Sequence, residues 1–168
     1  MRAKRLTHLA LYTAIALTVF VVEAQIPVPV PVPGVKWGLS NVVTLAALLF
    51  LGRRSAGLIL VSRITLGALV LGRPSALLFS AAGGLLAYLT MAFCIKLLPR
   101  TQIWVVSILG ALAHNAGQLL AAAVYLRSAT VFAFAPILTI SAIVTGCLTG
   151  LIARQLLRYE KWLGSTGT

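Results

Sequence analysis

Polar side chains that could bind a ligand are few in this chain, and most lie within apolar stretches. Six of them lie at depth in these stretches: Glu23, Asn41, Arg63, His114, Asn115 and Gln118. Ionisable and amide groups are costly inside a membrane, so such residues are candidates for a binding site by default. A lysine could meet an anionic group and a tryptophan could stack on a ring, so Lys36 and Trp37 join the predicted substrate-binding residues.

The composition places the chain in a membrane. Of its 168 residues, 60% are hydrophobic and only 10% are charged, and the mean hydropathy is +1.03. In a soluble domain, about a quarter of the residues are charged. The chain therefore lacks the polar surface that water requires. This excludes a soluble protein and predicts an all-α integral membrane protein with lipid around most of its surface.

Six transmembrane helices fit the length, within a single domain of residues 1–168. The predicted spans cover residues 6–24, 37–51, 56–71, 75–98, 103–125 and 130–156. The second and third are short, so we expect them to be tilted or partly buried. The basic start and the "VEA" before Gln25 also fit a signal peptide, but the long apolar run favours an uncleaved first span.

Lysine and arginine residues are distributed unevenly between the connections. The chain has 14 of them against two acidic residues, Glu23 and Glu160. With the N-terminus inside, the inner side receives Arg2, Lys4, Arg5, Arg53, Arg54, Lys96, Arg100, Arg154, Arg158 and Lys161, and the outer side only Lys36, Arg73 and Arg127. By the positive-inside rule, this bias predicts that both termini are cytoplasmic. Because the basic residues separate apolar runs and form no patch, no nucleic-acid partner is expected.

A Pro-Val repeat, "IPVPVPVPG", lies in the outer connection 25–36 between the first two predicted spans. Alternating prolines exclude a helix, because each ring removes a donor and disfavours helical geometry in the residue before it. The segment is therefore expected to be extended and stiff. Because it is also apolar, we predict that it forms a lid over the outer mouth of the bundle. A plain spacer is the alternative.

The depth of the six polar residues is informative. All lie in the outer half or at the midplane of the predicted bundle, and the inner half has almost no polar side chains besides serine and threonine. This predicts a pocket that opens to the outside and does not cross the membrane. The alternative is a structural role, through interhelical hydrogen bonds of about 0.6 kcal/mol each and an ion pair between Glu23 and Arg63.

Small residues recur four positions apart in two predicted spans. Ala10 and Ala14 lie in the first, and Gly146 and Gly150 in the sixth. Such pairs let helices approach closely, either inside the bundle or against a partner subunit. The two cysteines lie inside apolar segments and form no metal-binding or disulfide pattern, so neither a metal site nor a disulfide is predicted.

Segments along most of the chain, from about residue 8 to 155, carry a family resemblance: "EAQIPVPVPVPGVKWGLSNVVTL", "RITLGALVLG", "AGGLLAYLTM", "GALAHNAGQLLAA" and "PILTISAIVTGCLTGL". Together they resemble the Gx transporter family, also labelled heptaprenyl diphosphate synthase component I. More broadly, the chain resembles the substrate-binding S component of energy-coupling-factor (ECF) transporters of the prokaryotic plasma membrane. The resemblance implies six helices, a substrate near the outer face and a first loop that closes over it.

The resemblance also implies partners. S components bind vitamins or related small molecules and dock on a transmembrane coupling subunit driven by two ATPases. Their first helix makes this contact through small residues, which Ala10 and Ala14 match here. The expected function is therefore the capture of a vitamin-like or quinone/isoprenoid-related compound from outside.

The synthase label is a second possibility that the sequence can test. Prenyl diphosphate synthases bind Mg²⁺ and diphosphate through Asp-rich motifs, because hard cations need several carboxylates. This chain has no aspartate and no P-loop, so we expect no catalysis, ATP hydrolysis or bound cofactor. A non-catalytic membrane companion of a prenyl diphosphate synthase or quinone pathway stays open. A hydrolase using His114 is disfavoured, because no serine lies in a Gly-x-Ser-x-Gly context.

Overall fold

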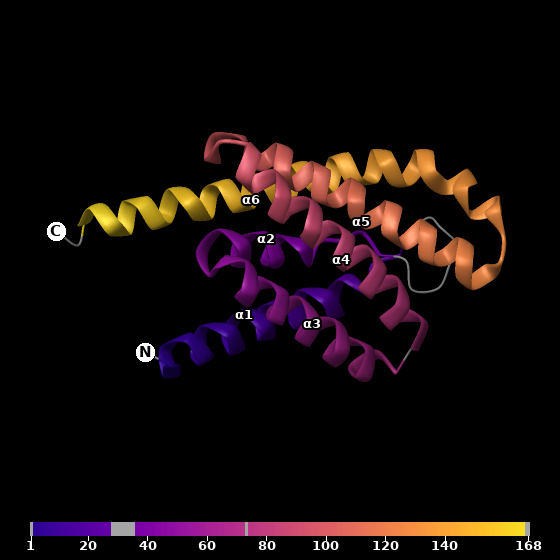
Figure 1. Ribbon diagram of the computed structural model, residues 1–168, viewed down its shortest axis with the longest axis horizontal. Helices are drawn as coiled ribbons and strands as arrows, with labels where there is room; N and C mark the ends of the chain where they lie inside the picture. The colour runs from indigo at the N-terminus through magenta and orange to yellow at the C-terminus, as the bar shows by residue number, and fades with distance from the viewer. Residues whose placement is uncertain (1, 28–35, 73, 167–168) are drawn as a thin grey trace.

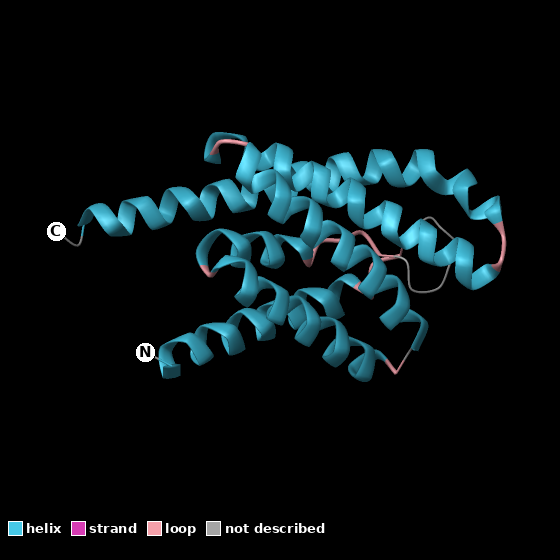
Figure 2. Cartoon of the chain, viewed as in Figure 1, coloured by secondary structure: helices cyan, strands magenta, loops and turns pink. Residues whose placement is uncertain are grey.

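The computed structural model describes residues 2–27, 36–72 and 74–166, and within these ranges every regular element is helical. Figure 1 shows the helices side by side in one bundle, and Figure 2 shows that helices make up most of the described residues. The elements are α1 (Arg2–Glu23), α2 (Asn41–Phe50), α3 (Gly52–Leu71), α4 (Pro74–Leu97), η1 (Arg100–Gln102), α5 (Ile103–Leu126), η2 (Ala129–Phe134) and α6 (Ala135–Thr166). The predicted all-α membrane class is confirmed.

Five helices, α1, α3, α4, α5 and α6, are long and apolar enough to cross a membrane. The predicted second span, 37–51, is longer than the helix found there, because α2 has only ten residues and begins at Asn41. A helix of that length reaches about 15 Å, or half of a hydrocarbon core of about 30 Å. The irregular segment 36–40 precedes it, and Lys36, Gly38 and Ser40 in this segment are buried. Non-helical backbone at membrane depth requires such burial in protein.

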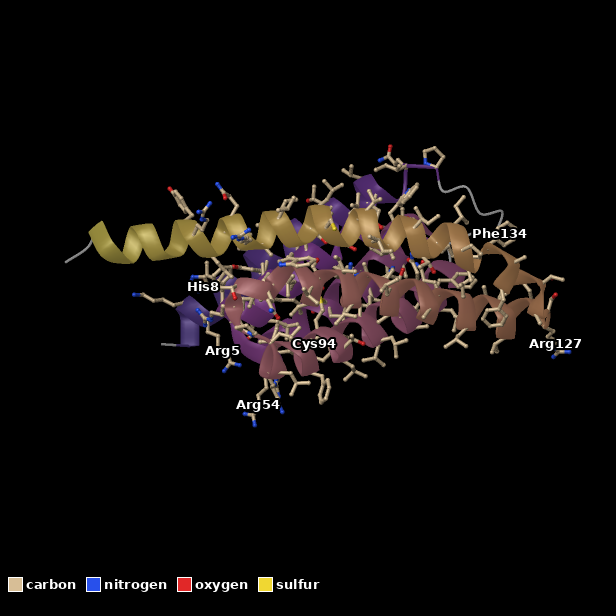
Figure 3. All side chains as sticks on the ribbon, turned by 90° about the horizontal axis from the view of Figure 1, so that it is seen from above. Arg5, His8, Arg54, Cys94, Arg127 and Phe134 are labelled. Carbon is tan, nitrogen blue, oxygen red and sulfur yellow. The ribbon has the colours of Figure 1, made fainter. Side chains whose placement is uncertain are left out.

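The bundle has basic residues at both ends and apolar side chains on its flanks. Both termini lie at one end (Figure 1), as the predicted topology requires. Arg5 and Arg54 lie toward this end, and Arg127 lies at the other (Figure 3). Large apolar side chains face outward between the ends; Leu69 and Val124, for example, are 78% and 77% exposed. A lipid environment satisfies such a surface, whereas water does not. Which end faces the cytoplasm stays a prediction.

The half of the bundle near the termini has an apolar core. Ile59, Met91 and Val106 meet there, in a cluster that also includes residues of α1, α2 and α6. All three side chains are at most 1% exposed. This packing closes the bundle at that end, so polar groups buried farther along are separated from the terminal end by packed side chains.

Helices α5 and α6 meet along what we call the α5–α6 seam, formed by Gly146, Gly150, Ser107 and Thr149. A Cβ atom at Gly146 would lie 2.6 Å from Ile108 Cα, and one at Gly150 would lie 2.7 Å from Trp104 Cα. Only glycine permits so close an approach of two backbones. The hydroxyls of Ser107 and Thr149 are 2.7 Å apart across the seam. The glycine pair therefore serves packing inside the bundle and does not dock a partner.

Helix α1 lies at an edge of the bundle and packs mainly on α3 (Figure 1). Phe20 is its main buried side chain; a Cβ at Gly67 of α3 would lie only 2.3 Å from the Phe20 ring. Ala10 and Ala14 lie on the opposite, exposed face of α1. The two small-residue pairs therefore have different surroundings, although their spacing is the same.

Candidate ligand-binding site

The site begins with the carboxylate that ends α1. Glu23 is 1% exposed. Its Oε1 accepts a hydrogen bond from the Gly38 N–H, and its Oε2 accepts one from the Ser40 N–H at 3.1 Å. Gly38 has φ +84°, a conformation that glycine adopts without the clash of a Cβ atom. One buried acid thus holds the irregular segment 36–40 in place.

Arg63, near the middle of α3, is the largest fully buried side chain and is 1% exposed. Its guanidinium donates a hydrogen bond to Ser40 Oγ. Ser40 therefore links the two charges, since its N–H bonds Glu23 and its hydroxyl accepts from Arg63. Gly84 of α4 leaves space for the guanidinium: a Cβ there would lie 3.3 Å from an Arg63 terminal nitrogen.

Phe20 lies beside two cations. The Lys36 ammonium lies 3.1 Å from the centroid of the Phe20 ring, and the Arg63 guanidinium carbon lies 5.6 Å from it. An aromatic face attracts a cation most strongly where water is excluded. The backbone N–H of Lys36 donates to Gln118 Oε1 at 3.3 Å, which connects segment 36–40 to α5.

His114 and Gln118 complete the site from α5. They share a face of the helix, because they are four residues apart. Both contact α4 where it has a glycine: a Cβ at Gly83 would lie 2.9 Å from His114 Nδ1 and from Gln118 Cγ. On the other side, a Cβ at Gly38 would lie 3.0 Å from His114 Cδ2 and 3.2 Å from Asn41 Nδ2. His114 therefore lies between α4 and segment 36–40, with Asn41 next to it.

We call this group the polar cluster; it consists of Glu23, Lys36, Ser40, Asn41, Arg63, His114 and Gln118. All seven side chains are at most 6% exposed. Several of their atoms have no hydrogen-bond partner in the described part of the chain: Asn41 Oδ1 and Nδ2, Arg63 Nε, His114 Nδ1 and Nε2, and Gln118 Nε2. Buried polar groups are rarely left unpaired in folded proteins. The cluster can therefore offer several donors and acceptors to a small molecule.

Two predicted site residues lie apart from the cluster. Asn115 faces α6, where its Nδ2 donates to the Leu138 carbonyl at 2.7 Å. It also lines an apolar groove of about 320 Å³ between α5 and α6. Trp37 is only half-buried, and its Nε1 donates to the Pro27 carbonyl at 3.3 Å. The predicted lid depends on residues 28–35, which lie outside the described residues, so it stays a prediction.

Sequence reasoning missed four residues of this region: Phe20, Ser40, Ser80 and Gly83. Ser80 is 3% exposed, and its Oγ has no partner among the described residues. It lies three residues before Gly83 and so shares that face of α4. This helical spacing could have been used as a signal. A serine one turn before a glycine pair indicates a polar helix face that a neighbouring side chain can approach closely. Phe20 gave no signal, since it is one of many apolar residues in its span.

Fold and site together define a polytopic helical membrane protein with a closed apolar half and a buried polar cluster in the other half. Within that class, the chain belongs to the heptaprenyl diphosphate synthase component I family, whose model matches residues 12–156. The matched range includes the whole polar cluster and the α5–α6 seam. No curated protein and no solved structure matches the chain.

Proposed function

We propose that the protein is the substrate-binding S component of an ATP-driven ECF-type importer in a prokaryotic plasma membrane. It captures a vitamin-like or quinone/isoprenoid-related compound from outside. The observation that carries the proposal is the polar cluster beneath a non-helical segment, because several of its buried donors and acceptors have no hydrogen-bond partner among the described residues. In a membrane protein, such backbone is tolerated where it is packed in protein or lines a cavity.

Binding without passage fits the arrangement of polar and apolar layers. The cluster lies in the half away from the termini, and the core around Ile59, Met91 and Val106 fills the other half. A channel needs a polar path through both halves. A capture subunit needs only one, and a partner then supplies the movement. The proposed role requires no catalysis by this chain.

The exposed face of α1 is the proposed docking surface for the coupling subunit. Ala10 and Ala14 lie on it, with Leu6 and Leu11 exposed beside them by 70% and 55%. A partner helix can approach α1 closely here, because the two side chains are small. Gly146 and Gly150 have no such freedom, since α5 already occupies their face.

Replacing both Ala10 and Ala14 with tryptophan tests the proposal. The double variant should insert and keep its bound ligand, because the added bulk points away from the core. It should no longer co-purify with the coupling subunit and the ATPases. Val144→Trp with Leu148→Trp is the matched control, because these residues have the same spacing on α6 and are 54% and 53% exposed.

Two results would contradict the docking assignment. Complex formation by the Ala10 and Ala14 double variant at the wild-type level would remove α1 as the contact. An equal loss of complex in the α6 control would show that bulk anywhere on the lipid face is harmful. Native mass spectrometry of the purified complexes measures both the subunits and the retained ligand.

A second candidate function follows from the family name, which describes a component of a heptaprenyl diphosphate synthase. In that role the protein is a non-catalytic membrane companion of a soluble prenyl synthase. Co-purification separates the two candidates. A coupling subunit with two ATPases supports import, whereas a prenyl synthase without ATPases supports the companion role.

A further inference from the structure

The polar cluster has more positive than negative side chains. Lys36 and Arg63 contribute two cations, and Glu23 contributes the one carboxylate. Both Glu23 oxygens already accept hydrogen bonds from the backbone of segment 36–40. A buried charge without a counter-charge is strongly unfavourable in a low-dielectric interior. The arrangement is therefore incomplete without one more negative charge.

The chain itself has no acid to supply that charge. It contains two acidic residues in total, and the second, Glu160, is near the C-terminal end of α6. That end lies far from the cluster, on the side of the bundle where the chain terminates (Figure 1). A further negative charge in the cluster would therefore have to come from a molecule other than this chain.

Several hydrogen-bond donors in the cluster have no partner among the described residues, which favours a ligand group that accepts hydrogen bonds. Arg63 Nε and Gln118 Nε2 are buried donors without partners among the described residues, and Asn41 Nδ2 is a third. An acidic group accepts several such bonds at once, and charge-assisted bonds are the stronger ones. A cationic ligand would add a third positive charge beside Lys36 and Arg63, which like-charge repulsion opposes.

We propose that the molecule bound in the polar cluster carries an acidic group, a carboxylate or a phosphate, held between Lys36, Arg63 and Gln118. The acidic group balances the excess positive charge of the cluster, and the remainder of the molecule extends from it. That this molecule is an imported substrate rests on the proposed function. The charge assignment itself does not, because it depends only on the cluster and on the composition of the chain.

A carboxylate built into the cluster tests the missing charge directly. Gln118→Glu keeps the shape of the side chain and the oxygen that accepts from Lys36 N–H, and it replaces an unpartnered donor with a negative oxygen. If the cluster lacks one negative charge, the ligand-free variant should melt above wild type, by about 3–8 °C. If the cluster is already neutral, the same change buries an extra charge and the variant should melt below wild type.

Two further variants keep this comparison decisive. Gln155→Glu, on the exposed part of α6, makes the same chemical change away from the cluster and should leave the melting temperature unchanged. Lys36→Met removes one cation, keeps the backbone bond to Gln118 and places an adaptable apolar chain on Phe20. It should melt at or above wild type when ligand-free. Lower melting of both Gln118→Glu and Lys36→Met overturns the proposal.

Added anions provide the second measurement. Sodium acetate and sodium phosphate, at an ionic strength matched with sodium chloride, should raise the melting temperature of wild type in a saturable way. They should have no such effect on Gln118→Glu or Lys36→Met. Equal protection by chloride means that an adventitious ion suffices, and equal protection of the variants means that the effect lies elsewhere. Either result overturns the proposal.

The source of the charge is read from the molecule that co-purifies with wild type. A water-soluble acid in the extract supports both the charge assignment and import, whereas an anionic phospholipid supports the charge assignment and contradicts an imported ligand at this site. The two proposals fail separately. Lower melting of both Gln118→Glu and Lys36→Met, with an intact ATPase complex, removes only the acidic ligand. Higher melting of Gln118→Glu in a protein that binds no coupling subunit or ATPases removes only the importer.

Discussion

The polar cluster and the α5–α6 seam are both buried, and both contain polar side chains with glycines beside them. They differ in whether their polar atoms have hydrogen-bond partners. In the seam, Thr149 Oγ1 bonds its own helix and lies 2.7 Å from Ser107 Oγ. In the cluster, His114 and Asn41 each have two side-chain atoms with no partner among the described residues. The seam is complete as a protein structure, whereas the cluster is complete only with another molecule.

The glycines differ in the same way. A Cβ at Gly146 would meet backbone, Ile108 Cα at 2.6 Å, which cannot move without separating two helices. A Cβ at Gly84 would meet only side-chain ends, Leu60 and Ile64 Cδ1 at 3.1 and 3.2 Å and an Arg63 terminal nitrogen at 3.3 Å. The seam glycines therefore determine how closely two helices pack, whereas Gly84 leaves space for side chains, including the guanidinium. Mutations in the two regions should accordingly separate stability from binding.

The largest effect is expected for Arg63→Ala, which should weaken retention of the co-purifying ligand while the protein still inserts. Removing one member of a buried charged contact costs about 2–5 kcal/mol, or a loss of at least about 30-fold in affinity. Ligand recovered per mole of folded protein measures this. Arg54→Ala, at an exposed position in the same helix, should retain ligand as wild type does. Wild-type retention by Arg63→Ala would make Arg63 a purely structural residue.

A smaller effect of the opposite kind is expected for Gly146→Ala in the seam. The new methyl group overpacks against α5, which costs about 1–3 kcal/mol of stability. Thermal unfolding in detergent measures the cost, and the ligand content of the folded fraction should stay normal. Gly57→Ala is the control, because its Cβ would make an ordinary contact of 3.5 Å with Tyr88. If both variants unfold alike, close packing at the seam is not the cause.

The smallest effect is expected for Glu23→Asp, which keeps the buried charge and sharpens the comparison inside the cluster. The side chain is one methylene shorter, so its carboxylate can reach only one of the two N–H groups of segment 36–40. Loss of one bond to a charged group, about 1.4 kcal/mol, should speed hydrogen exchange of the Gly38 and Ser40 amides about tenfold. Exchange across the seam should not change. Unaltered exchange at Gly38 and Ser40 would show that Glu23 does not hold the segment.

Much of the cluster could be predicted from sequence, because an ionisable residue in an apolar span is costly against lipid and therefore faces the interior of the bundle. Arg63 must turn inward wherever its neighbours are, and so must Glu23. Asn115 shows the limit of this reasoning. Adjacent helix residues point about 100° apart, so His114 and Asn115 face different neighbours. The depth of these residues in the membrane could be predicted from sequence, but the helix that each side chain contacts could not.

The start of α2 could not be predicted either. Residues 37–40 read as part of an apolar span, but Gly38 adopts φ +84° and Glu23 binds two backbone N–H groups there. The acid lies 15 residues before Gly38 in the chain. No local pattern contains this contact, so the helix was predicted to begin too early.

By itself the sequence determined that the chain is a helical membrane protein. With 60% hydrophobic and only 10% charged residues, its surface suits lipid and not water. It also showed that acidic residues are scarce, two against 14 basic ones, but only the structure showed that Lys36 and Arg63 are buried together with Glu23. Only the tertiary structure decided between the two small-residue pairs. Ala10 and Ala14 share the spacing of Gly146 and Gly150, but one pair is exposed and the other contacts the α5 backbone. Spacing defines a face of a helix, whereas the packing of the other helices decides what covers it.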